Sequence, residues 1–197
     1  MLNIKERQTI LKKINFYNGK IDGIEGPLTK KAYKLLQQKY FKRPIDIDGI
    51  YGKNTNLLLN NVKTFFNSKY FKLEEFRCHC NKYCTGYPCV VDKNLINNLN
   101  KLREVYGPII ITSGLRCFNH NKNVNGTSSS KHLIGKAVDI TNTKLNSLDS
   151  RKKCILKWLN FNNSDMGYCN GFMKYKNGQT ILFRSNSMGK SLHLQTK

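Results

Sequence analysis

The chain has 197 residues, of which 39% are hydrophobic and four are proline, so it can form one medium domain or two small ones and is not a disordered chain. Its 34 basic and 12 acidic side chains give a formal net charge of +22, which favours attraction to any polyanion, whether nucleic acid, an anionic membrane or the teichoic acids of a bacterial wall, and does not by itself choose among them. The lysines form no single block and no nucleic-acid motif is present, so we expect no specific nucleic-acid partner.

No targeting or membrane segment is visible in the sequence. The N-terminal residues, MLNIKERQTILKK, lack the apolar run of a signal peptide, and no run of about 18 apolar residues occurs. We therefore expect a soluble protein that is made in a cytoplasm, does not insert into a membrane and is a monomer.

Residues 1–66 contain an internal repeat. The stretches 21–29 and 47–55 share Ile, Asp, Gly, Ile, Gly and Thr at equivalent places. Each stretch predicts a tight turn whose glycines adopt unusual backbone angles, followed by a threonine that caps a helix. Apolar residues at helical spacing flank the turns, so we expect a small all-α module of three helices.

This module resembles the peptidoglycan-binding module that accompanies many cell-wall hydrolases. The resemblance implies that residues 1–66 bind peptidoglycan, and the loop residues Asp22, Glu25, Asp48 and Tyr51 are candidates for the contacts. A helical scaffold without a ligand is the alternative, because Asp-Gly turns and helix caps need no ligand. The residues that fit the pattern are Gln8, Leu11, Gly19, Asp22, Gly23, Gly26, Thr29 and Gln37.

A cysteine-rich segment follows a short linker at residues 67–70. Cys78, Cys80, Cys84 and Cys89 lie close together, and although their spacing is not that of a standard zinc finger, four thiols could hold a structural zinc ion. A disulfide or free thiols are the alternatives. We expect the remaining cysteines, Cys117, Cys154 and Cys169, to be small core residues.

The pattern of residues 71–197 predicts an α+β domain with an antiparallel sheet. Asp92 is a suitable cap for a helix that carries Leu95, Ile96, Leu99 and Leu102 on one face. Residues 108–112 read as a buried strand and 148–159 as a helix over the sheet. Asn177-Gly178 between apolar runs predicts a hairpin, and residues 191–195 alternate as an edge strand would.

The stretch from Ser113 to Ile140, SGLRCFNHNKNVNGTSSSKHLIGKAVDI, resembles the zinc peptidases of the D-alanyl-D-alanine carboxypeptidase type. Their pattern of S-G-x-R, then N-x-x-V-x-G, then S-x-H-x-x-G-x-A-x-D-I is matched without a gap. The resemblance implies the small α+β fold of bacterial cell-wall peptidases and of phage endolysins of this type. In the residues themselves, a histidine and an aspartate on either side of a glycine, in a loop that leads into a strand, suit a zinc ion with an open coordination position.

The resemblance also implies the residues of the site. His132, Asp139 and His193 would bind one catalytic Zn2+ together with a water molecule. Arg116 would face the substrate, where a guanidinium can bind a carboxylate and offset the charge of an oxyanion. Ser113, Asn121 and Ser130 lie on the motif, and we expect them to contact the substrate.

Two departures from the family pattern concern the general base. Gln195 stands where the family has Asp or Glu, and Lys190 stands where many members have the carboxylate that takes the proton from water. Asp165 is our candidate for a substitute base. Aligning residues 166–175 with the closing strand of the family instead would replace the third ligand by Lys174.

These observations predict a zinc-dependent peptidoglycan peptidase that hydrolyses a peptide bond in the stem or cross-bridge of the wall. We expect an endolysin-like protein, located in a host cytoplasm before release to the wall or carried on a virion. The alternative is a catalytically degenerate wall-binding component of a virion or surface. A third possibility is general polyanion binding through the net charge.

Overall fold

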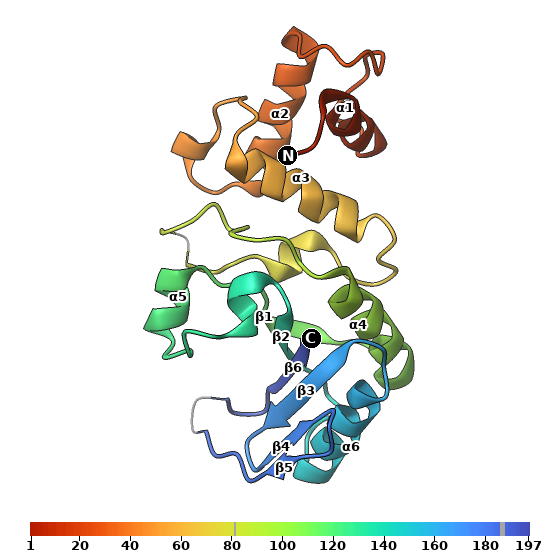
Figure 1. Ribbon diagram of the computed structural model, residues 1–197, viewed down its shortest axis with the longest axis vertical. Coiled ribbons are helices and arrows are strands. Elements are labelled where there is room, and N and C mark those ends of the chain that lie inside the picture. Colours follow the sequence, from red (N-terminus) through yellow and green to blue (C-terminus); the bar gives the residue numbers. More distant parts are fainter. Residues whose placement is uncertain (81, 186–187) are drawn as a thin grey trace.

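The computed structural model describes residues 1–80, 82–185 and 188–197 (Figure 1). The helices α1 (Ile4–Lys13), α2 (Pro27–Tyr40) and α3 (Lys53–Phe65) lie at one end of the long axis, and the sheet lies towards the other. None of the helices in the described part of the chain is long and apolar enough to span a membrane.

A buried glutamine holds each turn of the N-terminal repeat. Nε2 of Gln8 donates to the Asp22 carboxylate at 2.8 Å, while its Oε1 accepts the amide N–H of the next glycine at 2.9 Å. Gln37 repeats both bonds in the second turn, with Asp48 at 2.8 Å and the following glycine at 2.7 Å. Both aspartates, which we expected to contact the wall, are thus engaged in closing their own loops.

The other two loop residues that we expected to contact the wall are engaged in a similar way. Glu25 forms an ion pair with Arg7 and accepts the Tyr33 hydroxyl at 3.1 Å. The Tyr51 hydroxyl donates to Asn56 at 2.6 Å. Each of these side chains therefore has a structural partner within the module, and their contact with the wall stays a prediction.

A six-stranded antiparallel sheet with the order β1-β2-β6-β3-β4-β5 forms the centre of the remaining chain. The helices α4 (Lys93–Tyr106) and α6 (Leu148–Leu159) pack against it, which confirms the predicted α+β class. Asp92 caps α4 as predicted, since its Oδ1 accepts the Asn94 amide at 3.0 Å. The strands are β1 (Ile110–Ser113), β2 (Ala137–Thr141), β3 (Ser164–Cys169), β4 (Phe172–Tyr175), β5 (Thr180–Ile181) and β6 (Leu192–Thr196).

Strand β6 is an interior strand, so the predicted edge strand at residues 191–195 is wrong. It pairs with β2 on one side and β3 on the other, and all five of its residues are buried. The alternation that suggested exposure comes from His193 and Gln195, which bond to protein groups instead of water. His193 contacts Asp139 and Gln195 donates to Asp165.

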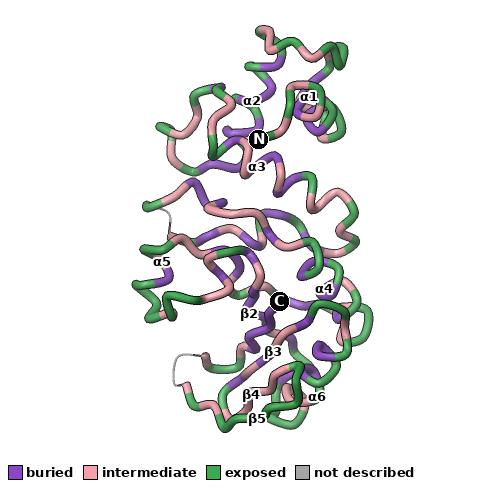
Figure 2. Tube along the Cα trace, in the orientation of Figure 1, coloured by how far each residue is buried: buried purple, intermediate pink, exposed green. Residues whose placement is uncertain are grey.

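The described residues of the loop that joins η2 (Leu73–Phe76) to α4 pack between the N-terminal helices and the sheet (Figure 1). Buried residues occur in the N-terminal helices, in this loop and in the sheet (Figure 2), and they belong to one hydrophobic cluster. Asn61 of α3 fixes the loop, because its Nδ2 donates to the Cys89 carbonyl at 2.9 Å and its Oδ1 accepts the Val91 amide at 2.8 Å. The short helical segments are η1 (Pro44–Asp46), η2 (Leu73–Phe76), α5 (Phe118–Asn123) and η3 (Lys131–Ile134).

Candidate metal centre

Three elements bring His132, Asp139 and His193 together. Asp139 in β2 lies directly opposite His193 in β6. His132 lies in η3, which ends at Gly135 in the left-handed conformation (φ 74°) and then turns into β2. A side chain at Gly135 would be strained and would also overlap the Val90 carbonyl, so glycine is required for this turn.

One nitrogen of each histidine and one carboxylate oxygen converge on a single point. His193 Nδ1 lies 2.8 Å from Asp139 Oδ1, His132 Nε2 lies 3.3 Å from the same oxygen, and the two ring nitrogens are 3.2 Å apart. Ligands about 2.1 Å from a tetrahedral zinc ion are about 3.4 Å apart. The three atoms are therefore spaced as one cation would need them.

The other nitrogen of each ring fixes its tautomer. His132 Nδ1 is 2.6 Å from the Gly114 carbonyl, which can only accept, so this nitrogen carries the proton. Gln195 Nε2 donates to Asp165 at 2.7 Å, which turns Gln195 Oε1 towards His193 Nε2 at 3.2 Å. The two nitrogens that face Asp139 thus carry lone pairs, and a cation relieves the repulsion among three acceptors.

Burial and hydrogen bonding set the charges of this cluster. Burial lowers the pKa of His132, which keeps the ring neutral and able to bind a metal. Burial alone would raise the pKa of Asp139, but the neighbouring rings of His132 and His193 outweigh burial and hold that pKa well below the usual range. Two neutral imidazoles and one carboxylate are the ligand chemistry of an open catalytic zinc site.

Arg116 lies beside the cluster and pairs with its carboxylate. The Arg116 guanidinium donates to Asp139 Oδ2, the oxygen that faces away from the histidines, and its Nε donates to Ser113 Oγ at 2.9 Å. Arg116 therefore orients the Asp139 carboxylate, and Ser113 orients the Arg116 side chain. Both also line the cleft above the cluster, where a substrate can reach them.

The cleft has a volume of about 730 Å³ and is lined on one side by polar residues of the loop before η3, Ser130 among them. Tyr168 of β3 lines the other side and stacks on His193, with ring centroids 4.3 Å apart. Burial, followed by the charge of Asp139, raises the pKa of Tyr168 to about 12, so its phenol stays protonated at neutral pH. Nothing in the sequence pattern pointed to Tyr168 beyond an aromatic residue in a strand.

Asn121 and Asp165 lie elsewhere than we expected. Asn121 is buried and its Nδ2 donates to the Thr127 carbonyl at 2.8 Å, so it supports the loop at the cleft rather than contacting substrate. Asp165 lies behind His193, on the far side of Gln195, and does not line the cleft. This position corrects the base prediction, because the side chain cannot reach a water in front of the ligands.

Neither Lys190, which stands at the general-base position of the family pattern, nor Lys174, the third ligand in the alternative alignment, lies at the cluster. Lys174 donates to the Gly178 carbonyl at 3.2 Å and to the Thr180 hydroxyl at 3.0 Å, within the β4–β5 hairpin. Lys190 is exposed and does not line the cleft. Of the described residues that line the cleft, Asp139 is the only carboxylate.

The thiol cluster contains Cys117 in place of Cys89. Cys78, Cys80, Cys84 and Cys117 have sulfur atoms that all lie within 4.8 Å of one another, and Cys89 is not part of this group. The predicted set and the predicted core role of Cys117 are both corrected. The cause is tertiary, since the loop that carries Cys117 folds back onto the segment after η2. Cys154 and Cys169 are buried core residues, as predicted.

The family model of Peptidase M15 matches residues 69–175, more than half of the chain, and the chain belongs to this family. The zinc D-Ala-D-Ala carboxypeptidase of Streptomyces albus G is similar, with 30% identity over 132 residues that cover 61% of this chain and 49% of that protein. This chain thus spans about half the length of that curated relative. The family match ends before β6, so the assignment of His193 depends on the geometry described above.

Proposed function

We propose that this chain is a zinc metallopeptidase that hydrolyses a peptide bond in the stem or cross-bridge of peptidoglycan. The observation that carries the proposal is the convergence of His132 Nε2, Asp139 Oδ1 and His193 Nδ1 at the floor of an open cleft. Membership of the Peptidase M15 family and the similarity to a zinc D-Ala-D-Ala carboxypeptidase support it.

The ligand set fits zinc and leaves one side free for water and substrate. A zinc ion held there would lower the pKa of a bound water and polarise the scissile carbonyl. The Gly114 carbonyl and the Gln195 amide hold the two imidazoles in the required tautomers. Arg116 holds the carboxylate of Asp139 by its outer oxygen, so the inner oxygen stays directed at the metal position.

The remaining cleft residues suit a peptide. Tyr168 keeps its proton at neutral pH and lies against His193, so it can donate a hydrogen bond to a substrate carbonyl or oxyanion. Ser113, Ser130 and Ser191 add polar groups along the walls. A cationic protein with such a cleft also suits a peptide that ends in a carboxylate.

A second candidate function is suggested by the carboxylates of the cleft. Because Asp139 is the only carboxylate among the described cleft residues and it binds the metal, no cleft carboxylate in the described ranges is left for the general base. This favours, as the alternative, a catalytically degenerate protein that binds walls and does not hydrolyse them. Both candidate proteins would bind walls, but only the peptidase would hydrolyse them.

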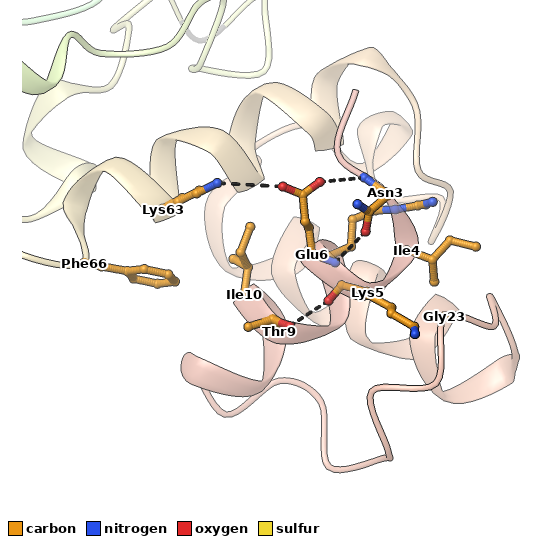
Figure 3. Close-up of a pocket in the computed structure, with 10 residues that line it drawn as sticks. Asn3, Ile4, Lys5, Glu6, Thr9, Ile10, Gly23, Lys63 and Phe66 are labelled. Atoms are coloured by element: carbon orange, nitrogen blue, oxygen red, sulfur yellow. Dashed lines mark hydrogen bonds and ion pairs between the residues drawn. The ribbon is translucent and has the colours of Figure 1, made fainter.

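We propose that the three N-terminal helices hold the protein on the wall. A cavity of about 770 Å³ lies between α1 and the end of α3 (Figure 3). Ile10 and the ring of Phe66 supply apolar lining, and Glu6, which pairs with Lys63 at 3.9 Å, supplies a carboxylate. An apolar surface with a few polar groups suits a sugar ring or a stem peptide. The net charge of +22 adds attraction to anionic wall polymers. Tethering would raise the local concentration of cleavable bonds.

An endolysin-like role would combine the proposed peptidase site with the proposed wall-binding helices. In this proposal the protein acts on the wall after release from a host cytoplasm, or from a virion. The two-part arrangement suits an insoluble substrate better than a soluble precursor.

The test uses purified full-length protein and isolated bacterial walls. We expect the zinc-loaded protein to lower the turbidity of the suspension and to release new amino termini, and a chelator or His193→Ala to abolish both. Lys190→Ala, a change at an exposed position outside the cleft, should leave them unchanged. If walls bind the protein but no amino termini appear, the degenerate candidate is correct.

The N-terminal cavity has its own test, which is co-sedimentation with walls. Phe66→Ala should weaken binding, whereas Ile45→Ala, at a residue that is 85% exposed outside this cavity, should not. Equal binding of both variants would contradict a role of the cavity.

A further inference from the structure

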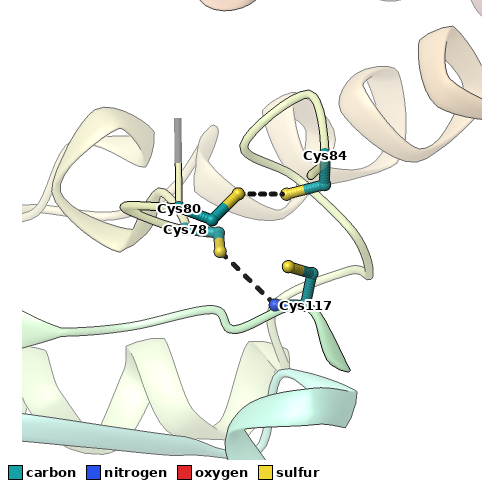
Figure 4. Close-up of side chains that lie close together, drawn as sticks. All are labelled: Cys78, Cys80, Cys84 and Cys117. Carbon is teal, nitrogen blue, oxygen red and sulfur yellow. Dashed lines mark hydrogen bonds between the residues drawn. The ribbon is translucent and has the colours of Figure 1, made fainter. Parts of the chain in front are cut away.

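Four cysteines from two distant segments converge in the loop region between the N-terminal helices and the sheet. Cys78, Cys80 and Cys84 follow η2, and Cys117 is the N-cap of α5. Their side chains point towards one another (Figure 4). The Cys80 and Cys84 sulfurs are 3.4 Å apart, well beyond a disulfide length of about 2.05 Å.

The spacing of the sulfur atoms is that of a tetrahedral metal site. All four lie within 4.8 Å of one another. Four thiolates about 2.3 Å from a zinc ion are about 3.8 Å apart, so small shifts would close the site. Cys89 is the nearest alternative by sequence, and it stays outside the group.

Backbone N–H groups directed at the sulfurs are a second, independent observation. The Cys117 amide donates to Cys78 Sγ at 3.3 Å, the Gly86 amide to Cys84 Sγ at 3.4 Å and the His120 amide to Cys117 Sγ at 3.5 Å. Hydrogen bonds of this kind stabilise thiolates and orient them as metal ligands. Gly86 has φ 102°, a conformation that favours glycine and allows the turn that carries its amide.

We propose that Cys78, Cys80, Cys84 and Cys117 bind a second zinc ion as a closed, structural four-thiolate site. It differs from the cluster at His132, because four protein ligands leave no position for water or substrate. Binding displaces the thiol protons and joins the two segments through the metal.

The site would fix a loop of the proposed catalytic centre. Cys117 directly follows Arg116, and two residues before Arg116 stands Gly114, whose carbonyl sets the tautomer of His132. The Leu115 amide already donates to the Phe76 carbonyl at 2.8 Å, at the start of the cysteine segment. A zinc ion at the thiols would add a second link between the same two segments and so hold the loop in register.

The experiment measures the metal content of the full chain, purified in reducing buffer with zinc present. We expect two zinc ions per chain in the unchanged protein, one in Cys84→Ser and in Cys117→Ser, and one in His193→Ala. Cys89→Ser, a cysteine of the same loop outside the group, is the matched control and should keep two. After exchange for Co2+, sulfur-to-cobalt charge-transfer absorption should persist in His193→Ala and disappear in Cys117→Ser.

A measurement on the unchanged chain guards against variants that fail to fold. A mercurial reagent that modifies thiols should release one zinc ion and leave the other bound. Three results would overturn the proposal: a single zinc ion that His193→Ala removes, no thiolate absorption in the reduced cobalt protein, or a Cys80–Cys84 disulfide in the purified chain with no metal at the thiols.

Discussion

Replacing Gln195 by leucine tests the hydrogen-bond chain behind the metal centre. In the native protein Asp165 accepts from Gln195, and Gln195 accepts from His193 Nε2. Leucine is of similar size and keeps the strand buried, but it offers no acceptor. The proton of the neutral His193 ring then moves to Nδ1. From there the N–H donates a hydrogen bond to Asp139 Oδ1, which lies 2.8 Å away.

The size of the expected change in zinc affinity depends on the interaction that zinc would have to displace. In Gln195→Leu the metal must remove a buried hydrogen bond between His193 Nδ1 and Asp139 that the native tautomer does not form. Outer partners of metal-binding histidines contribute about 10- to 100-fold in affinity, or about 1.4 to 2.7 kcal/mol. We therefore expect the zinc Kd to rise by that factor while saturating zinc restores most of the activity.

The assay is a competition titration with a chromogenic chelator at fixed pH. Gln179→Leu is the matched control, because Gln179 is exposed in the β4–β5 hairpin and should leave the Kd unchanged. Asp165→Asn should have a smaller effect than Gln195→Leu, since asparagine can still accept from Gln195. An unchanged Kd in Gln195→Leu would refute the tautomer argument.

Three further predictions concern stability. In Gly114→Ala the new Cβ would lie 2.6 Å from the backbone of η2, so thermal scans should show a loss of about 1 to 3 kcal/mol or more. Gly52→Ala has open space around it and should lose only the smaller amount, up to about 1 kcal/mol, by which alanine is the poorer N-cap of α3. Gln37→Ala removes the side chain that bonds to both Asp48 and Gly49 and should lower the free energy of unfolding in urea by about 2 to 4 kcal/mol. Gln38→Ala, at the exposed neighbouring position, should lower it little. Equal losses in the two variants would contradict the role of Gln37. In the metal-free chain the pKa of His132 is lower when folded than its unfolded value of 6.5, so the unfolded state takes up the proton first and stability should fall as the pH drops below that value. His132→Gln should reduce this pH dependence, and an unchanged slope would contradict it.

Patterns that are local in the sequence predicted the local structure well. The Asp92 cap, the helix at 148–159 and the hairpin at Asn177-Gly178 depend on neighbouring residues, and all three occur in the structure. The buried glutamines of the repeat also follow from a local pattern, although their role as hydrogen-bond hubs required the coordinates. Short-range periodicity and turn chemistry therefore account for most of the element boundaries.

Features that depend on long-range packing could not be read in this way. Cys117 joins a group that begins 39 residues earlier, and only the folded loop shows this. The alternating polar residues His193 and Gln195 of β6 suggested exposure, whereas both are buried and bond to other protein groups. Asp165 is one of few carboxylates in this part of the chain, and that scarcity says nothing about which side of His193 it occupies.

The most direct test of the central claim is anomalous diffraction at the zinc edge from crystals of the zinc-loaded protein. The account predicts a peak about 2.0 to 2.2 Å from His132 Nε2, Asp139 Oδ1 and His193 Nδ1, with water at the open position. A map with no peak between these three side chains, or a His193 ring turned so that Nε2 faces Asp139, would contradict it.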